Sequence, residues 1–224
     1  MTARADRRGA SAWWDDGVMT THAEMFFDPL CPWAWMTSRW LLEAAQVRDL
    51  EITWSVMSLS VLNEGRDLDE DYQAMLDRAW GPVRTIIAAT ADLTDDEAND
   101  LRKKMYDAYG QRIHLDGRGS EDLDAITVEV LEELGLDADL ARAGETDAHD
   151  EALRASHQRA IDLVGDDVGT PVVRVEDVAF FGPVVTPAPK GEAAGRLWDG
   201  CLLVAGTPGF YEIKRTRSVG PDFS

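Results

Sequence analysis

The stretch Glu24-Met-Phe-Phe-Asp-Pro-Leu-Cys31-Pro32-Trp33-Ala34-Trp-Met-Thr-Ser-Arg-Trp-Leu-Leu42 joins a strand signal directly to a helix signal. Residues 25–27 form an apolar run typical of a buried strand, and Asp28-Pro29 ends it. A helical pattern begins near Pro32 and is expected to reach about Ala45. Because proline is tolerated in a first helical turn, the pattern predicts that Cys31 lies at or beside the helix N-cap.

This predicted position bears on the chemistry of the Cys31 thiol. The unpaired amide donors and the positive end of a helix dipole favour the thiolate, which is the nucleophilic and redox-active form. For a cysteine taken alone, the competing interpretation is a small buried hydrophobic residue. The place between a strand and a helix favours a reactive thiol with a lowered pKa.

A second strand is expected directly after the helix. Residues 50–57 alternate apolar and polar side chains, as a strand does. Two strands separated by one helix form a βαβ unit with parallel strands and a right-handed crossover. This unit places Cys31 at the carboxyl edge of the sheet, where the sites of α/β folds collect.

The remainder of the chain is predicted to form a block of helices followed by a hairpin and a last helix. Gly81-Pro82 is expected to interrupt or kink the first helix, Thr94-Asp-Asp-Glu97 matches a capping box, and Gly110 is expected to stop the helix that follows. Helices are expected over 69–79, 83–91, 94–109, 120–135, 146–164 and 190–204, and hairpin strands over 170–175 and 178–181.

Composition excludes some classes of partner. The formal net charge of the 224 residues is −20, which argues against binding to nucleic acid or to an anionic membrane surface. Residues 64–150 hold 24 acidic and 9 basic side chains, so most of the excess lies in the helical block. The apolar runs are too short for a secretory segment or a membrane span, which makes the cytoplasm the expected location.

The number of cysteines also indicates a location in the cytoplasm. The only two cysteines, Cys31 and Cys201, lie far apart in the sequence, and a chain so poor in cysteine is typical of a reducing environment. Cys201 falls in the apolar pattern of the last helix and is expected in the core rather than as a partner of Cys31. His149 and His157 lack the spacing of a metal site, and no phosphate-binding glycine loop is present, so neither a metal nor a tightly bound cofactor is expected.

Several blocks in order carry a resemblance to a known family. Strand, Cys-Pro-Trp-X and amphipathic helix resemble the active-site turn of DsbA-family thioredoxin-fold proteins, and the wider pattern over roughly 24–217 resembles the actinobacterial mycothiol-dependent nitroreductases. The matching blocks are 27–33, Trp35, 37–40, 56–59, 62–64, 78–84, 112–114, 167–171, 179–184 and 214–217. The family pattern is Cys-Pro-Trp-Cys, whereas position 34 here is Ala34.

The resemblance implies an α/β fold, namely a thioredoxin fold with an inserted all-helical subdomain. In this division residues 1–22 are a flexible N-terminal extension and 23–63 are the first half of the thioredoxin fold. Residues 64–150 are the helical insertion, and 151–224 are the second half of the fold with the C-terminal tail. The basic tail over 210–217 is expected to dock onto the domain that precedes it.

The resemblance also implies an active-site motif and an opposing loop. Cys31 is the implied catalytic residue, in a motif with Pro32, Trp33 and Ala34. Thr170-Pro171, which stands before the first hairpin strand, is implied to be the cis-proline loop that faces the active cysteine. Its free backbone groups would then bind an extended thiol ligand, as in strand addition.

Four residues are implied to bind the thiol or the substrate, namely Trp33, Asn63, Tyr72 and His114. Each lies in or beside a block that resembles the nitroreductases. Packing between the sheet and the insertion is the competing interpretation for Trp33 and Tyr72. For His114 the competing interpretation is a helix C-cap.

The sequence therefore predicts a cytoplasmic thiol oxidoreductase that works through one thiol. Because Ala34 cannot form an internal disulfide, Cys31 is expected to form a mixed disulfide with a small thiol, mycothiol, which acts as a co-substrate. The other partner is a small electrophile or disulfide, and a homodimer is compatible with this reading. Two alternatives stay open: a transferase or isomerase like the kappa-class glutathione transferases, and a redox-silent binding protein that retains the pocket.

Overall fold

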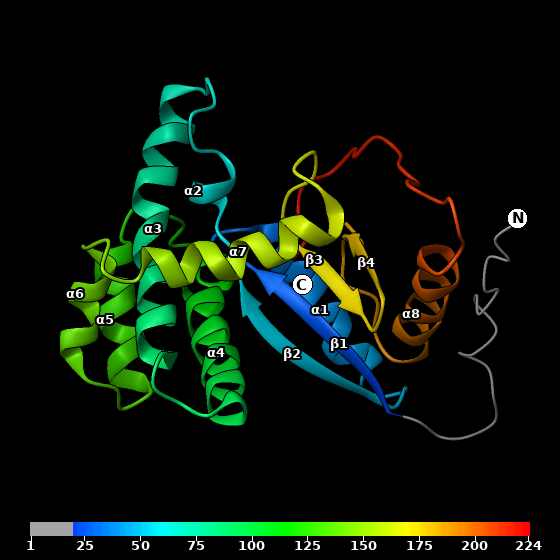
Figure 1. Ribbon diagram of the computed structural model, residues 1–224, viewed down its shortest axis with the longest axis horizontal. Coiled ribbons are helices and arrows are strands. Elements are labelled where there is room, and N and C mark those ends of the chain that lie inside the picture. Colours follow the sequence, from blue (N-terminus) through cyan, green and yellow to red (C-terminus); the bar gives the residue numbers. More distant parts are fainter. Residues whose placement is uncertain (1–19) are drawn as a thin grey trace, which may run out of the picture.

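The computed structural model describes residues 20–224 as a four-stranded mixed sheet with a large helical part beside it (Figure 1). The strands are β1 (Thr21–Phe27), β2 (Leu50–Val56), β3 (Val172–Val175) and β4 (Val178–Phe181), in the order β2-β1-β3-β4. β1 and β2 are parallel, as predicted, and β1/β3 and β3/β4 are antiparallel. Most of the predicted N-terminal extension, 1–19, lies outside the described residues, but Thr21 and His22 belong to β1 rather than to that extension.

Helices lie on both faces of the sheet. The first, α1 (Pro32–Ala44), lies behind the sheet in Figure 1 and packs with the last, α8 (Glu192–Ala205), whereas α7 (Asp150–Val164) crosses the front of the sheet. The β1–α1–β2 unit is the predicted βαβ unit. Its buried residues include Phe27, Trp40 and Trp54, so the core lies between the sheet and α1.

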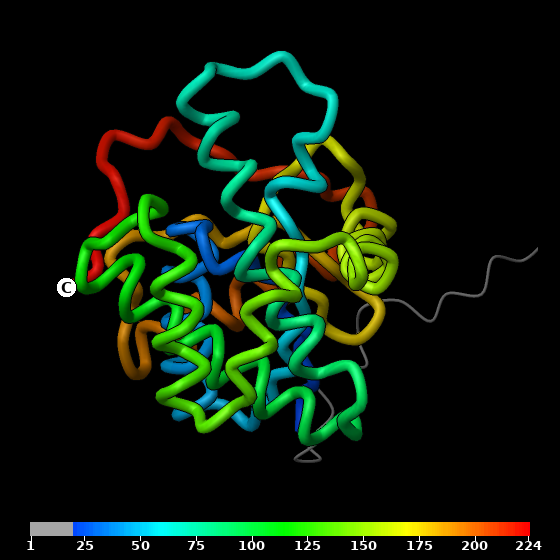
Figure 2. Tube along the Cα trace, turned by 90° about the vertical axis from the view of Figure 1, so that its left-hand side faces the viewer, coloured from blue at the N-terminus to red at the C-terminus, as the bar shows by residue number. Residues whose placement is uncertain are grey.

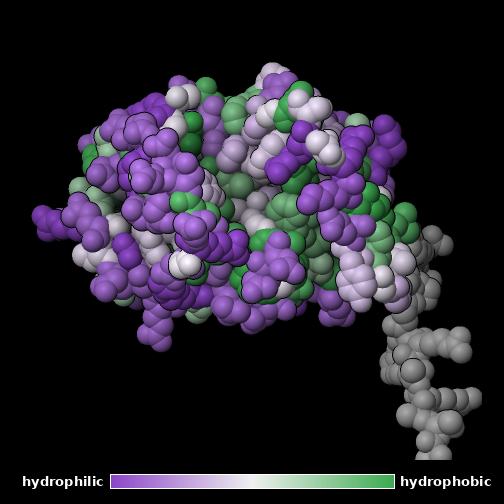
Figure 3. All heavy atoms as spheres, turned by 90° about the horizontal axis from the view of Figure 1, so that it is seen from above, coloured by the Kyte–Doolittle hydropathy of each residue, from purple (hydrophilic) through white to green (hydrophobic). Residues whose placement is uncertain are grey.

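The remaining helices stand to one side of the sheet. They are α2 (Leu59–Leu62), α3 (Glu70–Thr90), α4 (Asp95–Gly110), η2 (Gln111–Leu115), α5 (Leu123–Glu133), η3 (Ala138–Leu140) and α6 (Ala141–Gly144). Seen from above, the surface on their side of the molecule is largely hydrophilic, in agreement with the acidic excess of residues 64–150 (Figure 3). No helix in the described part of the chain is both long and apolar enough to cross a bilayer.

Three expected helix boundaries are wrong. Pro82 does not interrupt α3, since Pro82 is itself buried on the apolar face that includes Val83 and Ile86. The helix predicted from Ser120 begins at Leu123, and the one predicted from Thr146 begins at Asp150. The capping box of Thr94 and Glu97 is present as predicted.

Gly110 does not stop α4 either, because the chain continues into the π-helical turn η2. The glycine is needed for close packing instead: a Cβ atom at position 110 would lie 2.0 Å from the Trp35 ring. Trp35 belongs to the first turns of α1, so this contact seats the insertion against the helix that carries Cys31.

Replacing Gly110 by alanine is expected to lower the free energy of unfolding by about 1–2 kcal/mol. Because the added Cβ would lie 2.0 Å from the Trp35 ring, we expect a cost in the upper half of the range of about 1–3 kcal/mol typical of overpacking, which exceeds the gain of about 1 kcal/mol in helix propensity. Gly200→Ala is the matched control, because Gly200 lies in α8 with no atom within 4 Å of its added Cβ. It is expected to stabilise the protein, and urea unfolding of both variants measures the difference. Equal stabilisation by the two alanines would contradict the packing argument.

Candidate active site

Cys31 lies in the turn between β1 and α1, at the carboxyl edge of the sheet. It is the N-cap of α1, as predicted, and its Sγ accepts a hydrogen bond from the Ala34 N–H at 3.4 Å. The thiol in turn donates to the Thr170 carbonyl oxygen at 3.4 Å. The sulfur is therefore held between the first turn of α1 and the loop before β3.

The predicted low pKa of the Cys31 thiol is wrong for this conformation. Cys31 is only 5% exposed, and burial raises its pKa to about 12. The Ala34 and Trp33 backbone N–H groups favour the thiolate, as the N-cap argument requires, but the nearby Asp28 carboxylate opposes them. Desolvation outweighs the helix terminus here, and sequence alone does not report how deeply a cap residue is buried.

Asp28 is a site residue that the sequence reasoning missed. Its side chain is fully buried and accepts hydrogen bonds from the Leu30 N–H at 2.8 Å and the Leu59 N–H at 2.7 Å. Burial raises its pKa to about 6, against the effect of these two donors. Asp28 thus ties the active-site turn to the start of α2. The available signal is an acidic residue placed directly after a buried strand, a pattern that by itself predicts only the end of the strand.

The Thr170–Pro171 peptide bond is cis, and this loop lies against the Cys31 sulfur through the Thr170 carbonyl. The Thr170 hydroxyl has no hydrogen-bond partner among the described residues, although Thr170 is only 5% exposed. An unpaired hydroxyl in a buried position is uncommon, because leaving it unsatisfied costs about 1–3 kcal/mol. This hydroxyl belongs to the same residue whose carbonyl contacts the thiol, and its hydrogen-bonding capacity is unused among the described residues.

Asn63 and Tyr72 approach the thiol from the side of the insertion. Asn63 is the C-cap of α2, where its Nδ2 donates to the Leu59 carbonyl at 2.8 Å. Partial burial raises the pKa of the Tyr72 phenol, the charges of Cys31 and Asp28 act in the same direction, and a hydrogen bond with Asn63 acts in the opposite one. Tyr72 is nevertheless 38% exposed, so the phenol is not simply packed between sheet and insertion.

His114 and Trp33 lie next to the turn that carries Cys31. His114 lies within η2, and its Nε2–H donates to the Pro29 carbonyl in the active-site turn at 2.9 Å, so the imidazole does not cap its own helix. The imidazole lies 5.8 Å from the Trp35 ring, and burial lowers the His114 pKa to about 4. Trp33 is half-buried in the first turn of α1.

The second cysteine lies away from the site. Both cysteines are free, and Cys201 on α8 is half-buried and packs against the core, where the sequence predicted it. Burial raises the pKa of the Cys201 thiol to about 11. Ala34, which stands one helical turn after Cys31, is fully buried.

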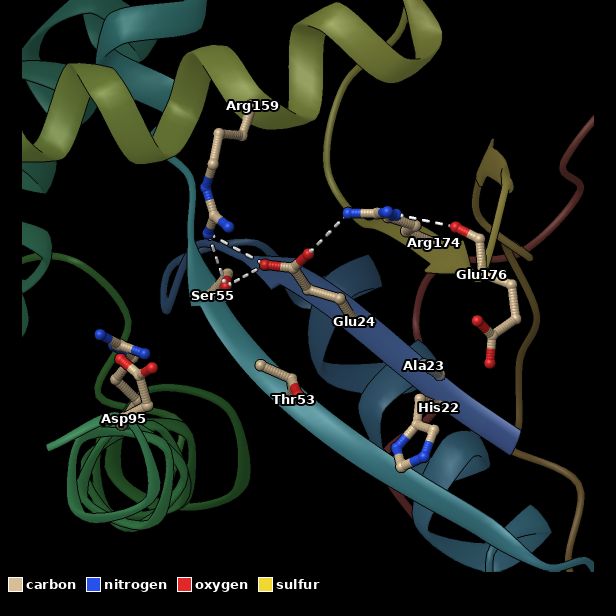
Figure 4. Close-up of a pocket in the computed structure, with 10 residues that line it drawn as sticks. His22, Ala23, Glu24, Thr53, Ser55, Asp95, Arg159, Arg174 and Glu176 are labelled. Carbon is tan, nitrogen blue, oxygen red and sulfur yellow. Dashed lines mark hydrogen bonds and ion pairs between the residues drawn. The ribbon is translucent and has the colours of Figure 1, made fainter. Parts of the chain in front are cut away.

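A cavity of about 620 Å³ lies on the front face of the sheet and holds none of these residues (Figure 4). There the Glu24 carboxylate accepts from Ser55 and pairs with Arg159 at 2.9 Å and Arg174 at 3.9 Å. Within residues 20–224, no group of three or more His, Cys, Asp or Glu side chains is arranged to hold a metal ion.

Comparison with known proteins relates this geometry to a family. Residues 30–215 match the family model described as "Rv2466c-like: Mycothiol-dependent nitroreductase Rv2466c". The uncharacterized protein Rv2286c of Mycobacterium tuberculosis is 31% identical over 202 residues, which cover 89% of this chain and 84% of that protein.

A solved structure confirms the predicted fold. The probable DsbA oxidoreductase SCO1869 of Streptomyces coelicolor aligns with 90% of this chain and 97% of its own, at 19% identity and a TM-score of 0.53. The chain therefore has the predicted DsbA-like thioredoxin fold with additional helices.

Proposed function

Since this chain belongs to the Rv2466c-like family of mycothiol-dependent nitroreductases and has a DsbA-like thiol oxidoreductase fold, we propose that it is a cytoplasmic reductase acting through the single thiol of Cys31. A small thiol, mycothiol, supplies the electrons, and a small disulfide or an electrophile such as a nitroaromatic compound accepts them. Residues 64–150 serve as the helical insertion that completes the site beside the thioredoxin halves 23–63 and 151–224.

The single observation that carries this proposal is the position of the Cys31 sulfur between the Ala34 N–H and the Thr170 carbonyl. A disulfide bound along the Thr170-Pro171 loop would present one sulfur to Cys31. Attack by the Cys31 thiolate forms a mixed disulfide with one half of the substrate and releases the other half as a thiol; one mycothiol then frees Cys31 and leaves as a mixed disulfide with the first half. A second round with another mycothiol converts this mixed disulfide into mycothiol disulfide and a thiol, so that two mycothiols together supply the two electrons that reduce one substrate disulfide.

The high pKa of Cys31 fits a thiol that is activated on ligand binding. In the closed site the thiol is protonated at neutral pH, because burial and the Asp28 charge both disfavour the thiolate. When the Thr170 contact opens for a ligand, the amide donors of the α1 N-terminus remain, and they stabilise the thiolate as it forms. The resting protein is thereby protected from adventitious oxidation.

Replacing Thr170 by valine is expected to stabilise the protein while slowing the reaction of the Cys31 thiol. Because the buried hydroxyl has no protein partner, exchanging it for a methyl group should raise the free energy of unfolding by about 1 kcal/mol. If the hydroxyl binds the ligand, adduct formation at Cys31 should slow about fivefold, since one hydrogen bond is worth about 1 kcal/mol. Thr170→Ser retains the hydroxyl and should keep the rate. A valine variant that reacts as fast as wild type would remove Thr170 Oγ1 from the site.

Intact mass after incubation with mycothiol disulfide or glutathione disulfide tests the proposed function. A Cys201→Ala background leaves Cys31 as the only thiol, and Cys31→Ser in that background is the negative control. A one-to-one adduct on Cys31, discharged by added mycothiol with formation of mycothiol disulfide, is the expected result. A thiol that stays unmodified would leave the redox-silent binding protein as the better description.

A transferase or isomerase like the kappa-class glutathione transferases is the second candidate, and Ala34 is the observation that favours it. Such an enzyme needs no resolving thiol. The product distinguishes the two functions: a transferase yields a stable conjugate of mycothiol with the electrophile, whereas a reductase yields mycothiol disulfide and a reduced electrophile.

A further inference from the structure

The C-terminal tail ends on two of the predicted site residues. The Arg217 guanidinium carbon lies 5.2 Å from the centre of the Trp33 ring, and the Phe223 ring stacks on His114 at 5.5 Å with an interplanar angle of 29°. Between them the Asp222 N–H donates to Thr186 Oγ1 at 2.7 Å. We call residues 217–223 the strap.

The chain leading to the strap makes little contact with the rest of the molecule. After α8 it has no regular secondary structure, and Tyr211 is 95% exposed and Ile213 77% exposed. The tail nevertheless returns across the molecule and ends beside the insertion segment that carries His114 (Figures 1 and 2). Phe223, near the end of the chain, is again half-buried against the core. An exposed segment that becomes ordered on site residues is held there by those contacts.

These contacts cover the rings that a flat ligand would use. A ring stacked on His114 and a cation over the face of Trp33 occupy the surfaces on which an aromatic or cyclic group binds best. Each contact is individually weak, so the strap can leave without unfolding the sheet or α8. Arg217 and Phe223 lie beyond residues 30–215, which match the family model, although Arg217 closes the 214–217 block of the resemblance.

We propose that the strap is a displaceable wall of the active site and that Arg217 and Phe223 determine which reagents reach Cys31. With the strap in place, slim reagents react and broad flat ones are slowed until the strap moves. This inference rests on the site assigned under the proposed function. It requires only that Cys31 react with disulfide-type reagents, not that the protein turn over with mycothiol.

The test compares two neutral reagents in a Cys201→Ala background. Methyl methanethiosulfonate transfers a methylthio group to the Cys31 thiolate and releases methanesulfinate. 4,4′-Dithiodipyridine transfers a thiopyridyl group and releases 4-thiopyridone, which absorbs light. The ratio of the two rate constants reports access for a flat ring and cancels any general change in thiol pKa.

Phe223→Ala and a chain ending at residue 209 are expected to raise the dithiodipyridine rate about tenfold relative to the thiosulfonate rate. Arg217→Gln should raise this ratio to a smaller extent. Tyr211→Ala is the matched control, because it removes an exposed aromatic ring from the same tail. An unchanged ratio in both Phe223→Ala and the shortened chain would overturn the proposal.

Tryptic cleavage after Arg217 gives a second readout that requires no mutation. The thiopyridyl adduct of Cys31 should be cut there several-fold faster than the methylthio adduct, because the larger group displaces the strap. Equal cleavage rates would show that the strap does not respond to what occupies the site. If the strap variants change the ratio of the two rate constants but the protein never turns over with mycothiol, only the proposed function is refuted.

Discussion

The Ala34→Cys variant is expected to form an internal disulfide with Cys31 and to discharge a bound thiol at least a hundredfold faster than the wild-type protein. Position 34 lies one helical turn after Cys31, and its N–H already contacts the sulfur. A thiol at this position attacks a Cys31 mixed disulfide within the molecule, where effective concentrations reach about 10⁵ M or more for well-oriented groups. The wild-type adduct must instead await a second thiol molecule.

The measurements are the lifetime of the mixed disulfide by intact mass and the reduction of a nitroaromatic dye with mycothiol. Ala34→Ser is the matched control, because it adds a similar side chain to the same fully buried position without a second thiol. Both variants pay an overpacking cost of about 1–3 kcal/mol, so only the difference between them reports resolution chemistry. If the wild-type protein turns over faster than Ala34→Cys, the missing cysteine is no defect and the transferase mechanism gains support.

Acidification from pH 7 to pH 4 is expected to reduce the free energy of unfolding by on the order of 3 kcal/mol through buried titrating groups. Burial lowers the pKa of both His114 and His157 to about 4, so the unfolded chain binds more protons below pH 6.5. The Ser58 N–H donates to His157 Nδ1 at 3.3 Å, which requires that nitrogen to be unprotonated. Asp28 opposes this trend, because its raised pKa of about 6 makes the folded state bind a proton between pH 4 and pH 6.

Two variants should change the slope of stability against pH in opposite directions. His157→Asn keeps an acceptor for Ser58 without a titrating ring and should flatten the slope between pH 4 and pH 6.5. Asp28→Asn removes the group that opposes acid unfolding and should steepen it. Urea unfolding at pH 4.5, 5.5 and 7 measures both slopes, with the exposed His22→Asn as control. If stability falls with the same slope against pH in all variants, the assignment of the pH dependence to His157 and Asp28 is contradicted.

The local signals of the sequence were enough to predict the secondary-structure elements that position Cys31. Strand, turn, N-cap cysteine and helix are encoded within one short stretch, and the parallel pairing of β1 with β2 follows from the single helix between them. The expected helix end at Gly110 is wrong because it depends on a partner far along the chain. Glycine usually ends helices, which predicts a stop at Gly110, whereas the role of this glycine is set by the Trp35 ring.

The electrostatics of the site were less predictable than its geometry. The N-cap donors of Cys31 are local and were expected, but the burial that outweighs them comes from surrounding segments. The same holds for Asp28, whose partner Leu59 lies in another element. A residue pattern locates a charged or nucleophilic group well, and it reports the dielectric around that group poorly.

The strand order has a consequence for synthesis on the ribosome. β1 lies between β2 and β3, yet β3 begins at Val172, about 150 residues after β1 begins at Thr21. At roughly 5–20 residues per second, the edge of β1 that receives β3 stays unpaired for on the order of ten seconds after β1 has been made. During that interval the nascent chain carries an apolar strand edge open to pairing with other chains, while the insertion helices form among themselves. Chaperone dependence should therefore be greatest for nascent chains that have passed residue 56 but do not yet include β3.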